Sequence, residues 1–238
     1  MYNLLRMATE KKRKVAIFDI DGTIFRSSLL IEVAEALVDA GVLEASVRKS
    51  YEAAYKKWRN REGSYEDYIM GVVRAFVANL KNVDYKTFVK ISKQVVTRQQ
   101  NHVYKYTRDL VAELKKKNYY LLAISNSPKV IVEEFGKKMG FDKVYGRMYE
   151  VSPEGNFTGQ IMHLDVISDK AKTIRRAAEK EGFTLNGSIG VGDTEGDIPM
   201  FKIVSKPICF NPNEILYKEA KKRGWQIVVE RKDVIYKI

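Results

Sequence analysis

The sequence predicts an α/β protein in which a parallel sheet carries helices on both faces and an all-helical segment is inserted after the first strand. Short, continuously apolar runs alternate with helical patterns along most of the 238 residues. Continuous apolarity is typical of parallel strands that are buried on both faces. The segment from about 27 to 100 breaks this alternation, because it contains helical periodicity and no convincing strand.

The strands of the sheet are predicted from apolar runs that end in turn-forming or acidic residues. In chain order they are expected at 15–20, 119–124, 187–191, 207–210 and 226–229. Helical patterns are expected at about 102–117, 128–139, 168–181 and 213–223. Two extended arms around a turn that contains Pro153, Gly155 and Asn156 predict a β-hairpin over about 144–161. Right-handed crossovers between parallel strands would place the helices on both faces.

Two apolar stripes predict the helices of the inserted segment. One consists of Tyr65, Tyr68, Ile69, Val72, Val73, Phe76, Val77 and Leu80, and the other of Leu30, Val33, Leu37 and Val38. Ser64 is expected to cap the helix that carries the first stripe, with Asp67 three residues later. Both stripes are interpreted as core packing and not as ligand sites. The predicted domains are therefore a core of residues 1–26 and 101–238 and a helical cap of residues 27–100.

The composition excludes several classes of protein. Hydrophobic residues make up 45% and aromatic residues 11%, which excludes a wholly disordered chain. A membrane-spanning helix is excluded because no run of 18 apolar residues occurs. The single cysteine, Cys209, excludes an internal disulfide and a cysteine-based zinc cluster. These features favour a cytoplasmic protein, and they leave the oligomeric state open.

The net charge of +12 is concentrated at the two ends of the chain. Residues 1–14 carry +4, residues 202–238 carry +5, and the rest of the chain carries +3. The basic run at 11–14 is typical of a nucleic-acid or nuclear-import patch, but also of a polar segment that leads into a strand. Because the excess does not follow one periodic face, a solvated basic surface is favoured and nucleic acid is not an expected partner.

Acidic side chains follow two of the predicted strands. Asp19 and Asp21 end the first strand, and Asp193 and Asp197 follow the strand at 187–191. Ligand sites of open α/β sheets lie beyond the carboxyl ends of the strands, so these carboxylates are expected to meet there. Clustered carboxylates repel one another unless a cation neutralises them. A site of oxygen ligands with few carboxylates favours Mg²⁺.

Two further side chains complement this acidic site. Ser125 follows the second predicted strand, and Lys170 opens the helical pattern after the hairpin. A lysine and a hydroxyl group beside carboxylates and Mg²⁺ make a site for a phosphoryl group. Lys172 is a rival for this lysine.

Taken together and in this order, these motifs resemble those of the haloacid dehalogenase-like superfamily of phosphohydrolases. The first motif of that superfamily, Asp-x-Asp-Gly-Thr, is complete at 19–23, and Ser125 and Lys170 match the second and third motifs. Asp193 and Asp197 match the fourth. The helical insertion and the hairpin resemble the phosphoserine-phosphatase-like branch. The resemblance covers nearly the whole chain and implies a Rossmann-like core with a helical cap.

The resemblance implies phosphomonoester hydrolysis of a small phosphorylated metabolite. Asp19 is the implied nucleophile, which forms an aspartyl-phosphate. Asp21 is the implied acid that protonates the leaving oxygen and then the base that activates water. Ser125, Lys170 and the backbone N–H of Asn126 are implied to bind the phosphoryl group.

The resemblance also implies Mg²⁺ as the cofactor, held by Asp19, Asp193 and the backbone carbonyl of Asp21. Three further residues are implied to support this set: Asp197, Thr23 and Gly22. The first would hold a metal-bound water or orient Lys170, the second would lock the loop by a hydrogen bond, and the third would permit its turn.

The sequence departs from phosphoserine phosphatases at the place where substrate is recognised. Ser28 stands where those enzymes have a glutamate that binds the substrate ammonium, and Glu32 is the next acidic residue. Residues 126–128 replace a glycine pair, and Gly196 replaces an asparagine. Phosphoserine is therefore not expected to be the preferred substrate.

Other interpretations remain open at this point. Four arginines could contact an anionic substrate: Arg26, Arg59, Arg61 and Arg74. A phosphotransferase or phosphomutase of the same superfamily would share the motifs, and a basic nucleic-acid-binding module without activity would share the charge.

Overall fold

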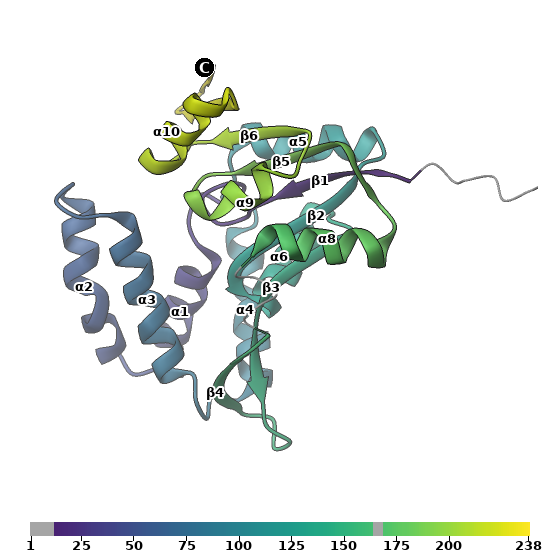
Figure 1. Ribbon diagram of the computed structural model, residues 1–238. Coiled ribbons are helices and arrows are strands. Elements are labelled where there is room, and N and C mark those ends of the chain that lie inside the picture. Colours follow the sequence, from purple (N-terminus) through teal and green to yellow (C-terminus); the bar gives the residue numbers. More distant parts are fainter. Residues whose placement is uncertain (1–11, 164–168) are drawn as a thin grey trace, which may run out of the picture.

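The structure is a computed structural model, and it describes residues 12–163 and 169–238. Figure 1 shows a sheet with its covering helices beside a group of helices from the insertion. The first eleven residues of the basic N-terminal segment lie outside the described residues.

One sheet runs through the described chain, with strand order β4-β3-β2-β1-β5-β6-β7-β8. Its strands are β1 (Lys14–Phe18), β2 (Tyr120–Pro128), β3 (Lys143–Val151), β4 (Phe157–Met162), β5 (Thr184–Gly192), β6 (Lys206–Phe210), β7 (Gln226–Arg231) and β8 (Val234–Lys237). Neighbouring strands are parallel, except for the outermost pairs β3/β4 and β7/β8. The five predicted parallel strands and the predicted hairpin, formed by β3 and β4, are confirmed.

Helices cover both faces of this sheet, as predicted. On one face lie α5 (Lys105–Lys116) and α6 (Lys129–Met139), and on the other lie α8 (Lys170–Glu181), α9 (Ile198–Phe201) and α10 (Glu214–Arg223). Alternate residues of β1 supply the two cores: Ala16 and Phe18 pack on the first face, and Val15 and Ile17 on the second. All four are fully buried, which explains the continuous apolar run of this strand.

The insertion is entirely helical. It consists of α1 (Leu29–Asp39), α2 (Ser46–Arg59), α3 (Tyr65–Asn79) and α4 (Tyr85–Gln99). The hydroxyl of Ser64 accepts a hydrogen bond from the backbone N–H of Asp67 at 3.0 Å, which confirms the predicted cap of α3. Helices α1 and α4 pack against α6, whereas α2 and α3 pack mainly on each other (Figure 1). One hydrophobic core continues from the sheet into the insertion.

Two features differ from the sequence prediction. Strand β8 was not expected, because its four residues are all exposed and show no alternation. The assignment of Tyr65 to a core stripe is wrong, because Tyr65 lies in the first turn of α3 and is 39% exposed. Other members of that stripe, including Val72 and Phe76, are buried as expected. Among the described residues, no helix is long and apolar enough to cross a membrane.

Candidate active site

Three aspartates meet at the carboxyl edge of the sheet because β1 and β5 are parallel neighbours. The backbone N–H of Asp19 donates to the carbonyl of Val191 at 2.9 Å, which ties the end of β1 to β5. One carboxylate oxygen each of Asp19, Asp193 and Asp197 lies within 4.8 Å of the others. The structure therefore brings together three of the four carboxylates that were expected to meet, and Asp21 instead contacts Ser125 and Ser127.

Lys170 joins two of these aspartates. It is the first residue of α8 and only 5% exposed, and its Nζ donates to Oδ1 of Asp19 at 2.5 Å and to Oδ1 of Asp197 at 2.6 Å. The side chain of Asp169 caps this helix by accepting a hydrogen bond from the backbone N–H of Lys172. Lys172 itself is exposed. The structure therefore brings Lys170 into the acidic cluster and leaves Lys172 outside it.

Asp197 is fully buried, and both of its oxygens accept hydrogen bonds. Oδ1 accepts from Lys170, and Oδ2 accepts from the backbone N–H groups of Asp193 at 3.0 Å and Thr194 at 3.2 Å. Asp197 and Thr194 form a reciprocal capping box at the short 3₁₀ helix η1 (Glu195–Asp197). The contact with Lys170 is compatible with one of the two roles that the resemblance implies for Asp197, the orientation of Lys170.

Asp21 is held by donors from two elements. Its Oδ2 accepts from the hydroxyls of Ser125 at 2.5 Å and Ser127 at 2.9 Å, both at the end of β2. Its Oδ1 accepts from the backbone N–H of Leu29 at 2.6 Å, at the N-terminus of α1, where the helix dipole also favours a carboxylate. Ser125 is fully buried, and its Oγ accepts from the backbone N–H of Ser127 at 2.9 Å.

The loop between Asp19 and α1 is locked against Asp193. The hydroxyl of Thr23 donates to Oδ1 of Asp193 at 2.8 Å. Gly22 has φ +77°, and a Cβ atom there would lie 2.2 Å from Oδ2 of Asp193. A larger residue is therefore excluded both by the backbone conformation and by the carboxylate.

Asn126, which was also predicted at the site, is exposed, and its side chain accepts a hydrogen bond from Arg147 at 3.2 Å.

Burial dominates the electrostatics of this site. It raises the pKa of Asp19 to about 8, because the charges of Asp197 and Asp21 add to the effect of burial and the nearby Lys170 only partly offsets it. Burial, followed by the charges of Asp19 and Asp197, also raises the pKa of Asp193 well above its ordinary value. Burial alone would lower the pKa of Lys170, but its two aspartate partners raise it. Lys170 thus stays charged, but it is a single positive group among the three aspartates of the cluster.

This oxygen-rich site fits a divalent cation. The hydrogen bonds described for Asp19 and Asp193 use Oδ1 of each residue, whereas both oxygens of Asp197 accept from N–H groups. A hard cation would reduce the repulsion that raises the two pKa values. The donor set therefore fits the Mg²⁺ that the sequence predicts.

Comparison with known proteins agrees with this geometry. A family profile described as haloacid dehalogenase-like hydrolase matches residues 16–202, which is most of the chain. The chain belongs to the haloacid dehalogenase-like hydrolases. The phosphoserine phosphatase of Methanocaldococcus jannaschii is 27% identical over 94% of this chain and 96% of its own. The histidinol-phosphatase of Neisseria meningitidis is 22% identical over 91% of this chain and 98% of its own.

Solved structures show the same fold for this hydrolase. A Bordetella pertussis protein whose function is unknown superposes with a TM-score of 0.71 at 18% identity, over 91% of this chain and 98% of its own. A phospho-aspartyl intermediate analogue of phosphoserine phosphatase superposes with a TM-score of 0.61 at 26% identity, over 94% and 96% of the two chains. The predicted phosphoserine-phosphatase-like branch is thereby confirmed.

Sequence reasoning missed two side chains of this hydrolase that lie close to the predicted site. Ser127 contacts Asp21, and its spacing of two from Ser125 on an extended strand could have indicated that both hydroxyls project to the same side. Arg147 reaches Asn126 from β3, and no local signal marks it, because the contact depends on how β3 pairs with β2.

The four arginines predicted as anion contacts lie in different places. Arg26 lines a cavity of about 320 Å³ that begins at Gly22. Arg59 and Arg61 are exposed at the C-terminal end of α2. Arg74 lines a separate cavity between α2 and α3. Of the four, Arg26 is therefore the one that the structure places beside the acidic site.

Proposed function

We propose that this hydrolase is a Mg²⁺-dependent phosphomonoesterase that acts on a small phosphorylated metabolite through an aspartyl-phosphate on Asp19. The observation that carries the proposal is the buried contact of 2.5 Å between Lys170 and Asp19, at the carboxyl edge of the sheet and beside Asp193. Two relatives that are similar over more than nine-tenths of the chain are named phosphatases of phosphomonoesters, which supports the same reaction class.

Asp19 and Asp21 divide the chemistry between them. A carboxylate oxygen of Asp19 attacks phosphorus, the bond from phosphorus to the leaving oxygen breaks, and Asp21 gives that oxygen its proton. Asp21 then takes a proton from water, whose oxygen attacks phosphorus and releases Asp19 and inorganic phosphate. Burial raises the pKa of Asp21, against the hydrogen bonds from Ser125, Leu29 and Ser127 that lower it, which supports a protonated acid in the first step.

Ser125 and Lys170 bind the phosphoryl group in this proposal, together with the backbone N–H of Asn126. Lys170 is held in place by Asp197, so its charge is positioned before substrate arrives. Because the hydroxyl of Ser125 is bonded to Asp21 in this structure, it has to rotate towards the phosphoryl oxygens. That rotation removes one of the three hydrogen bonds to Asp21, and those from Ser127 and the backbone N–H of Leu29 remain.

Asp19, Asp193 and the backbone carbonyl of Asp21 would hold Mg²⁺, which when bound supplies positive charge that screens the nucleophile from the phosphate. Thr23 fixes the orientation of Asp193 through its hydroxyl. Gly22 leaves room for the Asp193 carboxylate.

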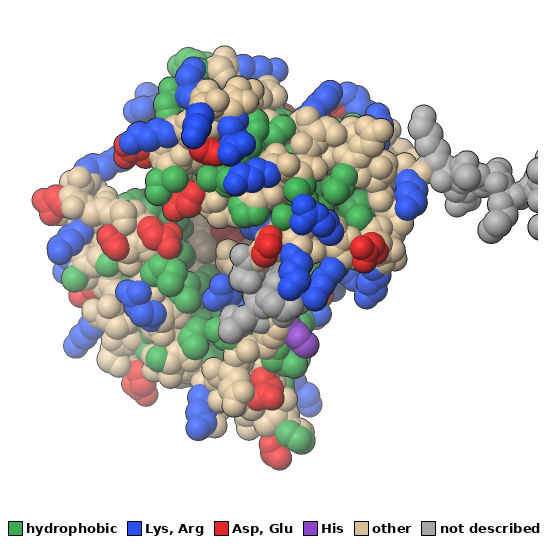
Figure 2. All heavy atoms as spheres, viewed as in Figure 1, with side chains coloured by type: hydrophobic (Ala, Val, Ile, Leu, Met, Phe, Trp, Pro, Cys, Tyr) green, Lys and Arg blue, Asp and Glu red, His purple; other side chains and the backbone are tan. Residues whose placement is uncertain are grey.

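Residues 27–100 act as a cap over a core of residues 1–26 and 101–238 in this proposal. The helices α2 and α3 lie across a hollow from the sheet, which Figure 2 shows between the two halves of the molecule. A cap in this place would exclude water and provide contacts to the organic part of the substrate.

A phosphatase assay tests the proposal. We expect the protein to hydrolyse p-nitrophenyl phosphate in the presence of Mg²⁺, with inorganic phosphate and nitrophenol released in equal amounts. Excess EDTA should abolish turnover, and added Mg²⁺ should restore it. Undiminished turnover in excess EDTA would overturn the metal requirement. Transfer of the phosphoryl group to an alcohol in place of water would instead indicate a phosphotransferase.

A further inference from the structure

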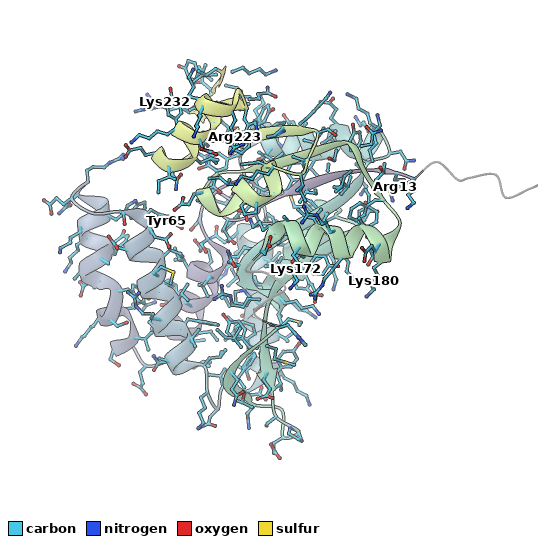
Figure 3. The ribbon with its side chains drawn as sticks, viewed as in Figure 1. Arg13, Tyr65, Lys172, Lys180, Arg223 and Lys232 are labelled. Carbon is cyan, nitrogen blue, oxygen red and sulfur yellow. The ribbon has the colours of Figure 1, made fainter. Side chains whose placement is uncertain are left out.

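A cavity of about 320 Å³ adjoins the acidic site and belongs mostly to the insertion. It begins at Gly22, the residue that faces the carboxylate of Asp193. Figure 3 shows Tyr65, another lining residue, at the start of α3 on the side that faces the sheet. Tyr65 is 39% exposed, yet partial burial and then the charges of Asp21 and Asp193 raise its pKa. The cavity therefore opens beside the carboxylates of the reaction site.

Aromatic rings form most of the wall of this cavity. They come from α2, from α3 and from the segment before α5: Tyr55, Trp58, Tyr65, Tyr68 and Tyr104. The rings of Trp58 and Tyr68 are stacked, with centroids 5.5 Å apart and planes 15° apart, and Tyr65 meets Trp58 edge-on at 5.4 Å. Trp58 remains 37% exposed beside these contacts, so its ring is not fully covered by the protein.

The charge around the cavity is mixed. Arg26 is the charged side chain in the described lining, and its guanidinium lies over the ring of Tyr104, 5.2 Å from the centroid. The described lining contains no carboxylate. Two carboxylates on α1, Glu32 and Glu35, accept hydrogen bonds from other side chains of the insertion. Carboxylates outside the lining still act on the cavity, because, after burial, the charges of Asp21 and Asp193 raise the pKa of Tyr65 and those of Glu35 and Glu32 raise the pKa of Tyr68.

We propose that the organic part of the substrate is a flat, unsaturated ring, bound against the aromatic wall of this cavity while its phosphate lies at Asp19. This inference rests on the proposed phosphatase function and narrows its substrate class. The aromatic wall provides ring surface for contact with such a substrate, and Arg26 lines the same cavity as the charged group nearest to a negative or electron-rich substituent. A volume of about 320 Å³ is within the range of small-molecule sites.

Two phosphate esters of matched size test the role of the ring. Benzyl phosphate and cyclohexylmethyl phosphate have similar leaving alcohols, but only the first has a flat ring. We expect kcat/KM for benzyl phosphate to be higher by about tenfold or more, which corresponds to stacking on one or two aromatic faces. Pyridoxal 5′-phosphate and a nucleoside 5′-monophosphate then distinguish a small ring from a nucleobase, and both should exceed phosphoserine and phosphocholine.

A variant of the wall provides the second measurement. Trp58→Ala should lower the ratio of the two kcat/KM values to near one, whereas Tyr236→Ala, which removes an exposed ring on β8, should leave the ratio unchanged. Equal use of the two esters by the unmodified protein, or a preference for phosphocholine, would overturn the inference while leaving the phosphatase function intact. Failure to hydrolyse any of these esters with Mg²⁺ would instead overturn the proposed function.

Discussion

The buried carboxylate of Asp19 should make the metal-free protein less stable at neutral pH, so Asp19→Asn is expected to stabilise it while abolishing turnover. An amide is a poor nucleophile, which accounts for the loss of activity. The gain in stability has a separate cause. Asp19 is 8% exposed and lies near the carboxylates of Asp193 and Asp197, and an amide removes one negative charge from this group.

The size of the effect follows from the pKa of Asp19. Burial raises it from 3.8 to about 8. Because one pKa unit corresponds to about 1.4 kcal/mol, the ionised carboxylate of Asp19 lowers the free energy of unfolding by at most about 6 kcal/mol. The substitution also removes the charge attraction between residue 19 and Lys170, although Lys170 keeps its contact with Asp197. A net gain of about 1–3 kcal/mol in the free energy of unfolding is therefore expected.

The size of this gain depends on pH. Below about pH 4 the acid is protonated in both the folded and the unfolded chain, so the substitution should have little effect. As the pH rises from 4 to 8, the unfolded chain loses this proton first and the folded protein is progressively destabilised. The advantage of Asp19→Asn should therefore be small at pH 5 and largest at pH 8.

Urea unfolding in EDTA at pH 5 and pH 8 measures this difference. Asp84→Asn is a matched control, because Asp84 is an exposed cap of α4 whose pKa is lowered by its hydrogen bonds from Thr87, and asparagine retains the capping oxygen. The control should be nearly unchanged at both pH values. If Asp19→Asn proved less stable than the unmodified protein at pH 8, the ion pair with Lys170 would outweigh burial and the reasoning would be refuted.

Three further substitutions test other parts of the site. Lys170→Met leaves buried aspartates without their shared cation, so we expect a loss of about 3–5 kcal/mol in urea unfolding together with loss of turnover; unchanged stability would contradict the role of the ion pairs. Gly22→Ala should cost about 1–2 kcal/mol from the positive φ alone and strongly reduce kcat, whereas Gly196→Ala, with ordinary contact distances, should be tolerated in both assays. Ser127→Ala removes a hydrogen bond that lowers the pKa of Asp21, so the basic limb of the pH–rate profile should move to higher pH; an unmoved limb would mean that this hydroxyl has no influence on proton transfer.

The predicted site residues could be located from the sequence because each lies at the end of a strand or the start of a helix. Asp19 and Asp193 follow apolar runs whose continuous apolarity is typical of buried parallel strands, and adjacent strand ends bring them together. The cap of α3 at Ser64 could be predicted as well, because a hydroxyl three residues before an acidic residue is a pattern within one short segment. The fold was predictable for the same reason, since the alternation of elements sets the layers.

What could not be predicted depends on contacts between distant segments. Ser125 was predicted as a site residue, but its contact with Asp21, like that of Ser127, spans more than a hundred residues and depends on the register of β1 and β2. Tyr65 follows the helical spacing of a core residue, but the space beside it is left open as a cavity. Strand β8 is short, and all of its residues are exposed, so hydrophobic periodicity gives no signal there.

Chemical trapping of the reaction intermediate tests the central claim most directly. The protein would be mixed with Mg²⁺ and p-nitrophenyl phosphate, quenched in acid during turnover and treated with borohydride, which reduces an acyl phosphate to an alcohol. Peptide mass spectrometry would then locate the reduced side chain. The proposed mechanism predicts reduction at Asp19 and at no other aspartate, and none when substrate is omitted. Turnover without a reduced side chain, or reduction at Asp193, would contradict the assignment of Asp19 as the nucleophile.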